Sequence, residues 1–119
     1  MREVVLRTPS GETAPCLVAE RISERLVGLI GRAEAPRGGL LIRPCRSVHT
    51  AFMRFPCDVV FLARDGRVLR VSANTRPWRI RFAPLRTRCV LELASGEASR
   101  LGLEQGATVT TDDDDDDLF

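Results

Sequence analysis

The sequence predicts a mainly β domain, and three observations lead to that class. Short runs of β-branched and other apolar residues recur between segments rich in proline and glycine. Only one stretch, from Glu20 to Arg32, spaces its apolar residues as a helix does. The chain has 119 residues, 44% of them hydrophobic and 29% charged, which suits one globular domain. We therefore expect a compact antiparallel β-sandwich or barrel, formed by residues 1–111 as a single domain.

The first third of the chain predicts a hairpin followed by a helix. Residues 3–8 and 14–19 are β-prone, and the Pro-Ser-Gly-Glu segment between them supplies turn chemistry. A helix is expected near residues 20–31, where Gly31 suits the left-handed conformation that ends a helix. The apolar residues at helical spacing are Ile22, Leu26, Leu29 and Ile30.

The middle of the chain predicts further strands. "GLLIRP" and "VHTAFMRF" each have a strand-like pattern. The Asp65-Gly66 pair between two β-rich runs is a hairpin signal, because glycine adopts positive φ at no steric cost. We expect Val59 to Ala63 and Arg67 to Ala73 to be antiparallel partners.

The last third is more irregular. "NTRPWRIRFAPLRT" is polar and interrupted by proline, which indicates a surface loop with at most one irregular strand. "RCVLELAS" is a strand candidate, a helical turn is expected near residues 96–101, and "ATVTT" predicts a last strand.

Charge is distributed unevenly along the chain. All 18 basic residues are arginine, a skew that GC-rich codon usage explains without reference to function. Between Arg32 and Arg88 there are 13 arginines and three acidic residues, whereas residues 112–117 are six consecutive aspartates. Because like charges repel one another, residues 112–119 are expected to form a disordered acidic tail.

The four cysteines are widely spaced, and the N-terminal stretch has no apolar run typical of a secretion signal. Free, mostly buried thiols are therefore expected rather than disulfides. No apolar run approaches the length of a membrane span, so we expect a cytoplasmic protein without a membrane partner.

Four blocks of the sequence, in order, resemble the bacterial and archaeal family DUF192. "ERLVGLIGR" matches a family helix block through Arg25, Gly28, Leu29, Ile30 and Arg32. "GGLLIRP" is followed by the central block "VHTAFMRFPCDVVFLARDGRVLRV" and then by "CVLELASGEASRLGLEQGATV". The resemblance covers about residues 14–110. It departs from the family pattern at Cys57, Ala63 and Ala107.

The resemblance implies a compact, mainly β fold of jelly-roll-like type and brings no established activity. It also raises an association with envelope or pilus secretion systems, near whose genes some relatives lie. The first functional prediction is accordingly a small binding or accessory module, a monomer or weak dimer that binds a small molecule or a protein.

The segment from Arg46 to Asp58 is the predicted site. Arg46, His49 and Asp58 would supply polar groups, with Phe52 and Met53 as an apolar wall. Asp58 lies inside an apolar run, so its carboxylate needs partners, either backbone N–H groups of the turn after Pro56 or a nearby arginine. His49 is expected to be partly buried and hydrogen-bonded.

Other interpretations of these residues stay open. An enzyme could use His49 with Asp58 or Glu92 as acid and base, although the alternation in "VLEL" indicates that Glu92 faces solvent and pairs with an arginine. Cys45 and His49 are too few for a zinc site, so neither a metal ion nor a cofactor is expected.

A third interpretation is nucleic-acid binding. Trp78 and Phe82 alternate with arginines in "NTRPWRIRF", as stacking residues do in basic grooves. Arginines on the wet face of a strand give the same pattern, so single-stranded nucleic acid or another polyanion ranks below the binding module.

Overall fold

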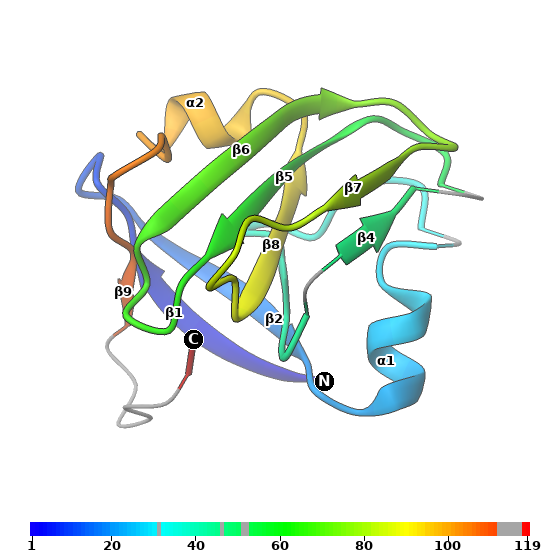
Figure 1. Cartoon of the computed structure of the whole chain (residues 1–119), viewed down its shortest axis with the longest axis horizontal. Helices are drawn as coiled ribbons and strands as arrows, with labels where there is room; N and C mark the ends of the chain where they lie inside the picture. Colours follow the sequence, from blue (N-terminus) through cyan, green and yellow to red (C-terminus); the bar gives the residue numbers. More distant parts are fainter. Residues whose placement is uncertain (31, 46, 51–52, 112–117) are drawn as a thin grey trace.

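The computed structural model describes residues 1–30, 32–45, 47–50, 53–111 and 118–119. One curled sheet of seven strands dominates the fold, and a two-stranded sheet and two short helices lie against it (Figure 1). The order in the large sheet is β6-β5-β8-β3-β2-β1-β9, and β4 pairs with β7 in the small one. The strands are β1 (Arg2–Arg7), β2 (Thr13–Ala19), β3 (Leu40–Ile42), β4 (Ser47–His49), β5 (Cys57–Leu62), β6 (Val68–Thr75), β7 (Ile80–Phe82), β8 (Cys89–Ala94) and β9 (Thr110–Thr111). The helices are α1 (Ile22–Val27) and α2 (Glu97–Arg100).

The mainly β class is confirmed, but the prediction of an entirely antiparallel sandwich or barrel went further than the structure supports. Strands β2 and β3 run parallel, so the large sheet is mixed. The crossover from β2 to β3 contains α1, since parallel neighbours need a long connection. The helix is thereby placed beside the sheet, next to β4 (Figure 1).

Both predicted hairpins are confirmed. Strands β1 and β2 pair antiparallel, as do β5 and β6 across the Asp65-Gly66 turn. The strand predicted from "VHTAFMRF" is shorter than expected, because β4 ends at His49. Its partner β7 is the one strand within the predicted long loop.

Helix α1 is shorter than predicted. It ends at Val27, and Gly28 is the C-cap, with φ 52° and ψ −123°. Gly31, the expected end, lies outside the described residues. No residue of α1 is buried, and Ile22, Leu26 and Val27 are more than half exposed. The helix therefore displays apolar side chains to solvent.

The large sheet has a hydrophobic cluster on each face. Along β5, Val60 and Leu62 belong to one cluster, whereas Val59 and Phe61 belong to the other. Strand β8 alternates in the same way, because successive side chains of a strand point to opposite faces. Both central strands are therefore covered on both faces.

The C-terminal residues Leu118 and Phe119 join the first of these clusters, with exposures of 1% and 8%. These two residues are therefore packed against the domain. The six aspartates that precede them lie outside the described residues. No helix in the described part of the chain has the length and apolar character needed to cross a membrane.

Candidate functional site

Glu92 is buried in the middle of β8, with 3% of its surface exposed. The prediction that it faces solvent is wrong, because β8 is a central strand covered on both faces. The one hydrogen bond recorded for its side chain among the described residues is weak, with the Cys57 thiol 4.0 Å from Oε2. Burial raises the pKa of the Glu92 carboxyl from 4.5 to about 7. A buried acid without a cationic partner is costly, so it needs a functional explanation.

Glu92 lines a cavity of about 220 Å³ between α1, β3 and β4. The walls are mostly apolar and come from segments far apart in the sequence. They include Leu29, Ile42, Val48 and Met53. A pocket with apolar walls and a few polar groups is the usual form of a small-ligand site.

Arg25 also lines this pocket, and part of its guanidinium has no partner. Its Nη1 donates to the Pro44 carbonyl at 3.1 Å. Its Nε is buried and has no hydrogen-bond partner among the described residues. The same side chain lines an adjoining groove of about 240 Å³, together with Ile22 and Pro44. The pocket is thus lined by an arginine with an unpaired Nε–H and by an acid whose one recorded contact is weak.

Gly28 gives α1 its close approach to Glu92. A Cβ at this position would lie 3.3 Å from Glu92 Oε1, and the positive φ further disfavours any other residue. The glycine therefore keeps space free in front of the carboxyl.

The predicted residues His49 and Met53 both line this pocket. Met53 is buried within the hydrophobic cluster, at 6% exposure, as expected of a core or wall residue. His49 is exposed rather than partly buried, and it pairs with Ile80 across the small sheet. The structure therefore brings His49, Met53 and Glu92 together. Arg46 and Phe52, the other predicted wall and polar residues, lie outside the described residues.

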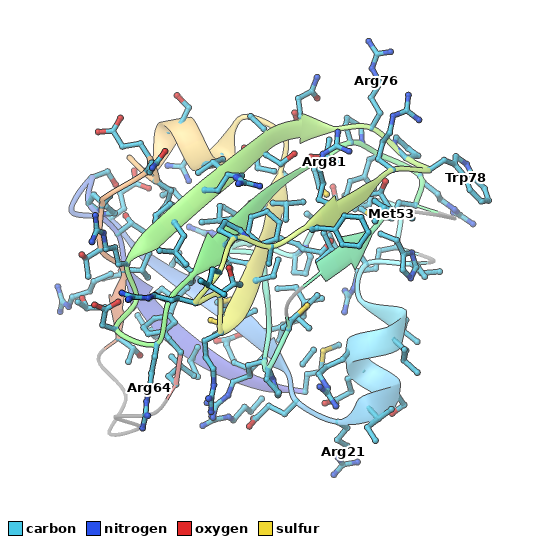
Figure 2. All side chains as sticks on the ribbon, in the orientation of Figure 1. Arg21, Met53, Arg64, Arg76, Trp78 and Arg81 are labelled. Carbon is cyan, nitrogen blue, oxygen red and sulfur yellow. The ribbon has the colours of Figure 1, made fainter. Side chains whose placement is uncertain are left out.

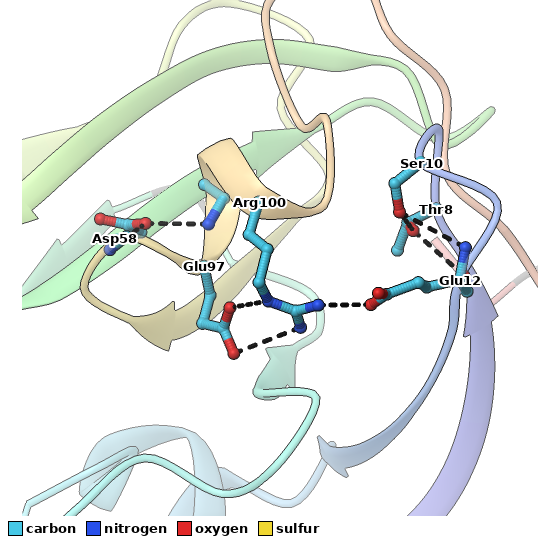
Figure 3. Close-up of polar contacts among 8 residues, drawn as sticks. Thr8, Ser10, Glu12, Asp58, Glu97 and Arg100 are labelled. Carbon is cyan, nitrogen blue, oxygen red and sulfur yellow. Dashed lines mark hydrogen bonds and ion pairs between the residues drawn. The ribbon is translucent and has the colours of Figure 1, made fainter.

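Asp58 lies elsewhere. It is 1% exposed, and its Oδ1 accepts from the Asn74 N–H at 2.8 Å. Its Oδ2 accepts from the N–H groups of Gly96 and Ala98, at 3.0 and 2.9 Å (Figure 3). The prediction that Asp58 pairs with N–H groups of the turn after Pro56, or with an arginine, is therefore wrong. The carboxylate instead ties the start of α2 to the sheet, and it does not meet His49.

Three of the four thiols are poorly suited to nucleophilic chemistry. All four cysteines are free, as predicted, and Cys16, Cys57 and Cys89 are buried. Burial raises the pKa of each of these three to about 12, so little reactive thiolate forms near neutral pH. No group of three or more His, Cys, Asp or Glu side chains within the described segments could hold a metal ion.

Two of the larger cavities contain charged side chains that have partners. One of about 610 Å³ is lined by Glu12, Glu97 and Arg100. The Arg100 guanidinium bridges the two carboxylates, joining α2 to the β1–β2 turn (Figure 3). The other, of about 500 Å³, contains the fully bonded Asp58. The 220 Å³ pocket differs from both, because its arginine has an unpaired Nε–H and its acid has one weak thiol contact.

Sequence reasoning missed Arg25 and Gly28 as site residues. The signal was available, since both stand in the helix block that resembles the family pattern. Met53 stands in the central block and Glu92 in the last one. Three distant blocks therefore contribute to one pocket.

A family model described as DUF192, Uncharacterized ACR, matches residues 5–111. The chain belongs to the DUF192 family. A comparison with curated proteins finds no match.

Two solved structures are similar to this chain, each with a TM-score of 0.78. One is a protein of unknown function from Novosphingobium aromaticivorans, with 28% identity over 91% of this chain and 83% of that chain. The other, from Sinorhizobium meliloti, is described as "a putative transcription regulator" and is 29% identical over 92% of each chain. The likeness supports the fold throughout the domain.

Proposed function

We propose that this DUF192 protein is a binding module whose pocket beside α1 holds a small polar group with an apolar body. The group would offer an N–H to Glu92 and an acceptor to the Nε–H of Arg25. The ligand chemistry that provides both on adjacent atoms is the amide, as in a primary carboxamide or a peptide side chain.

The observation that carries this proposal is that one pocket is lined by Arg25, whose Nε–H has no partner among the described residues, and by the buried Glu92, whose one recorded contact is weak. Buried polar groups are normally hydrogen-bonded, and each exception costs about 1–3 kcal/mol. A ligand that satisfies both groups recovers this cost on binding. The apolar walls supply the remaining affinity through burial of the ligand body.

Three probes of similar size test the proposal. Phenylacetamide offers donor and acceptor, phenylacetate offers acceptors alone, and phenethylamine offers donors alone. Binding is measured from backbone amide shifts around Gly28, Met53 and Glu92 in ¹H–¹⁵N spectra. The amide should bind about tenfold more tightly than either charged probe, the factor expected for one additional hydrogen bond. Equal affinities, or shifts confined to other regions, would contradict the proposal.

A pair of variants locates the effect. Glu92→Met keeps the length of the side chain but removes the acceptor, so the preference for the amide should disappear. Glu104→Met makes the same chemical change at an exposed position that lines a different cavity, and it should leave the preference unchanged.

A second candidate function is acid–base catalysis, favoured by His49 and Glu92 lining the same pocket. A carboxyl whose pKa is near 7 is suited to proton transfer at neutral pH. The same sample tests this candidate: hydrolysis would add water to phenylacetamide, break its C–N bond and release ammonia and phenylacetate. If the spectrum of phenylacetamide is unchanged after long incubation, the protein does not hydrolyse this amide, and the binding function is the one supported. A partner from an envelope or pilus secretion system stays a prediction.

A further inference from the structure

We propose that the outer surface of the small sheet binds an anionic lipid bilayer. This surface, called here the β7 face, comprises the exposed side chains of Trp78, Ile80 and Phe82. The inference goes beyond the proposed pocket function and rests on different residues. It also replaces the sequence-based expectation of no membrane partner with a peripheral contact.

The β7 face is apolar and open to solvent. Trp78, Ile80 and Phe82 are 61%, 60% and 74% exposed. Ile80 and Phe82 point to the same side of β7 because residues two apart in a strand share a face. Trp78 projects from the edge of the molecule beyond the end of β7 (Figure 2). Large exposed apolar patches mark protein or membrane contacts.

The turn that presents Trp78 is firmly braced. Thr50 is fully buried, and its hydroxyl donates to the Arg76 carbonyl at 2.6 Å. The Arg79 N–H donates to the same hydroxyl at 2.8 Å, and the Trp78 N–H donates to the Thr50 carbonyl at 3.0 Å. The exposed ring is therefore held outward by a hydrogen-bonded turn rather than by a loose loop.

The apolar surface continues past the pocket to α1. Ile80 pairs with His49, which lines the pocket mouth together with Leu26 and Val27 of α1. Leu26 and Val27 are 68% and 52% exposed. A band of apolar side chains therefore extends from β7 to the helix.

Charge indicates which partner covers this band. The segment from Arg76 to Phe82, which carries the β7 face, contains three arginines and no acidic residue. None of these arginines has an ion-pair partner among the residues that the structure describes. Tryptophan and arginine beside exposed aliphatic residues suit the boundary of an anionic bilayer, where the rings lie at the headgroups.

Nucleic acid fits the same face less well. Arg81, one of the arginines in the predicted stacking pattern, points to the inner side, where its Nε donates to the Ser72 hydroxyl at 3.0 Å. Its Nη1 donates to the Ile80 carbonyl at 2.9 Å. Between Ile80 and Leu26, the described part of the band offers one ring, the imidazole of His49, and is otherwise aliphatic, so it gives successive bases little on which to stack. Lipid can cover all of it.

Trp78 is the only tryptophan, so its fluorescence reports directly on the β7 face. The full chain is mixed with vesicles of phosphatidylcholine alone or phosphatidylcholine with phosphatidylglycerol. We expect co-sedimentation and a blue shift of emission only with the anionic vesicles, both weakened by added salt. Absence of both signals with anionic vesicles would overturn the proposal. So would an oligodeoxythymidylate that quenches Trp78 and displaces the vesicles.

Variants separate the apolar and charged contributions. Phe82→Ser should remove most of the binding, and Arg79→Gln should weaken it about fivefold, the factor expected for one basic residue at an anionic surface. Arg64→Gln makes the same charge change on the opposite side of the molecule (Figure 2) and should have little effect. Equal losses for Arg79→Gln and Arg64→Gln would show attraction by net charge alone and would overturn the assigned face.

Discussion

Two buried carboxyl groups lie on neighbouring strands and have opposite surroundings. Asp58 on β5 and Glu92 on β8 are 1% and 3% exposed. Asp58 accepts three backbone hydrogen bonds, whereas Glu92 has one weak thiol contact and a cavity before it. In the sheet register Asp58 is opposite Leu93, and Glu92 is opposite Val59. This offset of one residue turns the two side chains to opposite faces of the sheet.

The hydrogen-bond partners of a buried carboxyl group distinguish a structural role from a functional one better than its burial does. A carboxylate with its acceptor sites filled stabilises the fold and leaves little for a ligand to do. A carboxyl with similar burial and no strong partner has a raised pKa and capacity for a new bond. We therefore expect Asp58 variants to change stability, and Glu92 variants to change pH dependence and binding.

The largest expected effect is that of Asp58→Ala. The substitution leaves the N–H groups of Asn74, Gly96 and Ala98 without their acceptor, so unfolding free energy should fall by about 3–5 kcal/mol. Urea denaturation at neutral pH measures it. Asp58→Asn keeps one carbonyl oxygen and should lose about 2 kcal/mol. A loss below 1 kcal/mol for the alanine variant would show that these bonds do not hold α2.

Glu92→Gln should alter how stability depends on pH. Since the folded pKa lies above the unfolded value of 4.5, the folded state binds more protons between pH 4.5 and about 7. Stability of the wild-type protein should therefore fall as pH rises through this range, by about 3 kcal/mol from this group. Glutamine does not titrate. The unfolding free energy of the variant minus that of the wild type, measured by denaturation at several pH values, should therefore rise by this amount as pH increases. A difference that does not change with pH would refute the raised pKa.

Local sequence signals predicted the parts of the fold that form locally. The Asp65-Gly66 turn and the "PSGE" turn each join strands that are neighbours in the sequence, and both hairpins formed. The β2–β3 pairing is parallel and spans α1, so no turn residue marks it. Glu92 was misplaced for a related reason. Alternation indicates a solvent face only when one side of a strand is open, and β8 is covered on both.

The site was partly predictable for the same reason. His49 and Met53 lie close together in the sequence and were chosen from their residue types. Arg25 and Glu92 meet them only through the fold, and Arg25 was visible beforehand only as part of a family block. The need of a buried arginine nitrogen for a partner becomes apparent only once its surroundings are known.

Gly28→Ala should lower the unfolding free energy by less than the substitutions of Asp58 and Glu92 change it. The positive φ and the Cβ contact with Glu92 Oε1 together should cost about 1–2 kcal/mol. Gly11→Ala is the matched control, because Gly11 also has positive φ but nothing within 4 Å of its Cβ position. The Gly28 variant alone should shift the titration of Glu92, followed by NMR of the side-chain carboxyl. Equal titration in both variants would remove Gly28 from the site.

His49→Ala should change stability least, within about 0.5 kcal/mol, because the side chain is exposed and its neighbours lose little packing. Its effect should instead appear in the pocket, where removal of the ring opens the mouth between α1 and β4. Phenylacetamide should bind several-fold more weakly while urea denaturation is unchanged. This combination would distinguish a wall of the binding site from a support of the fold. If the variant instead lost stability as well as affinity, His49 would be a structural residue, as Asp58 is. If its affinity for phenylacetamide were unchanged, His49 would not belong to the binding site, which would then rest on Arg25, Gly28 and Glu92.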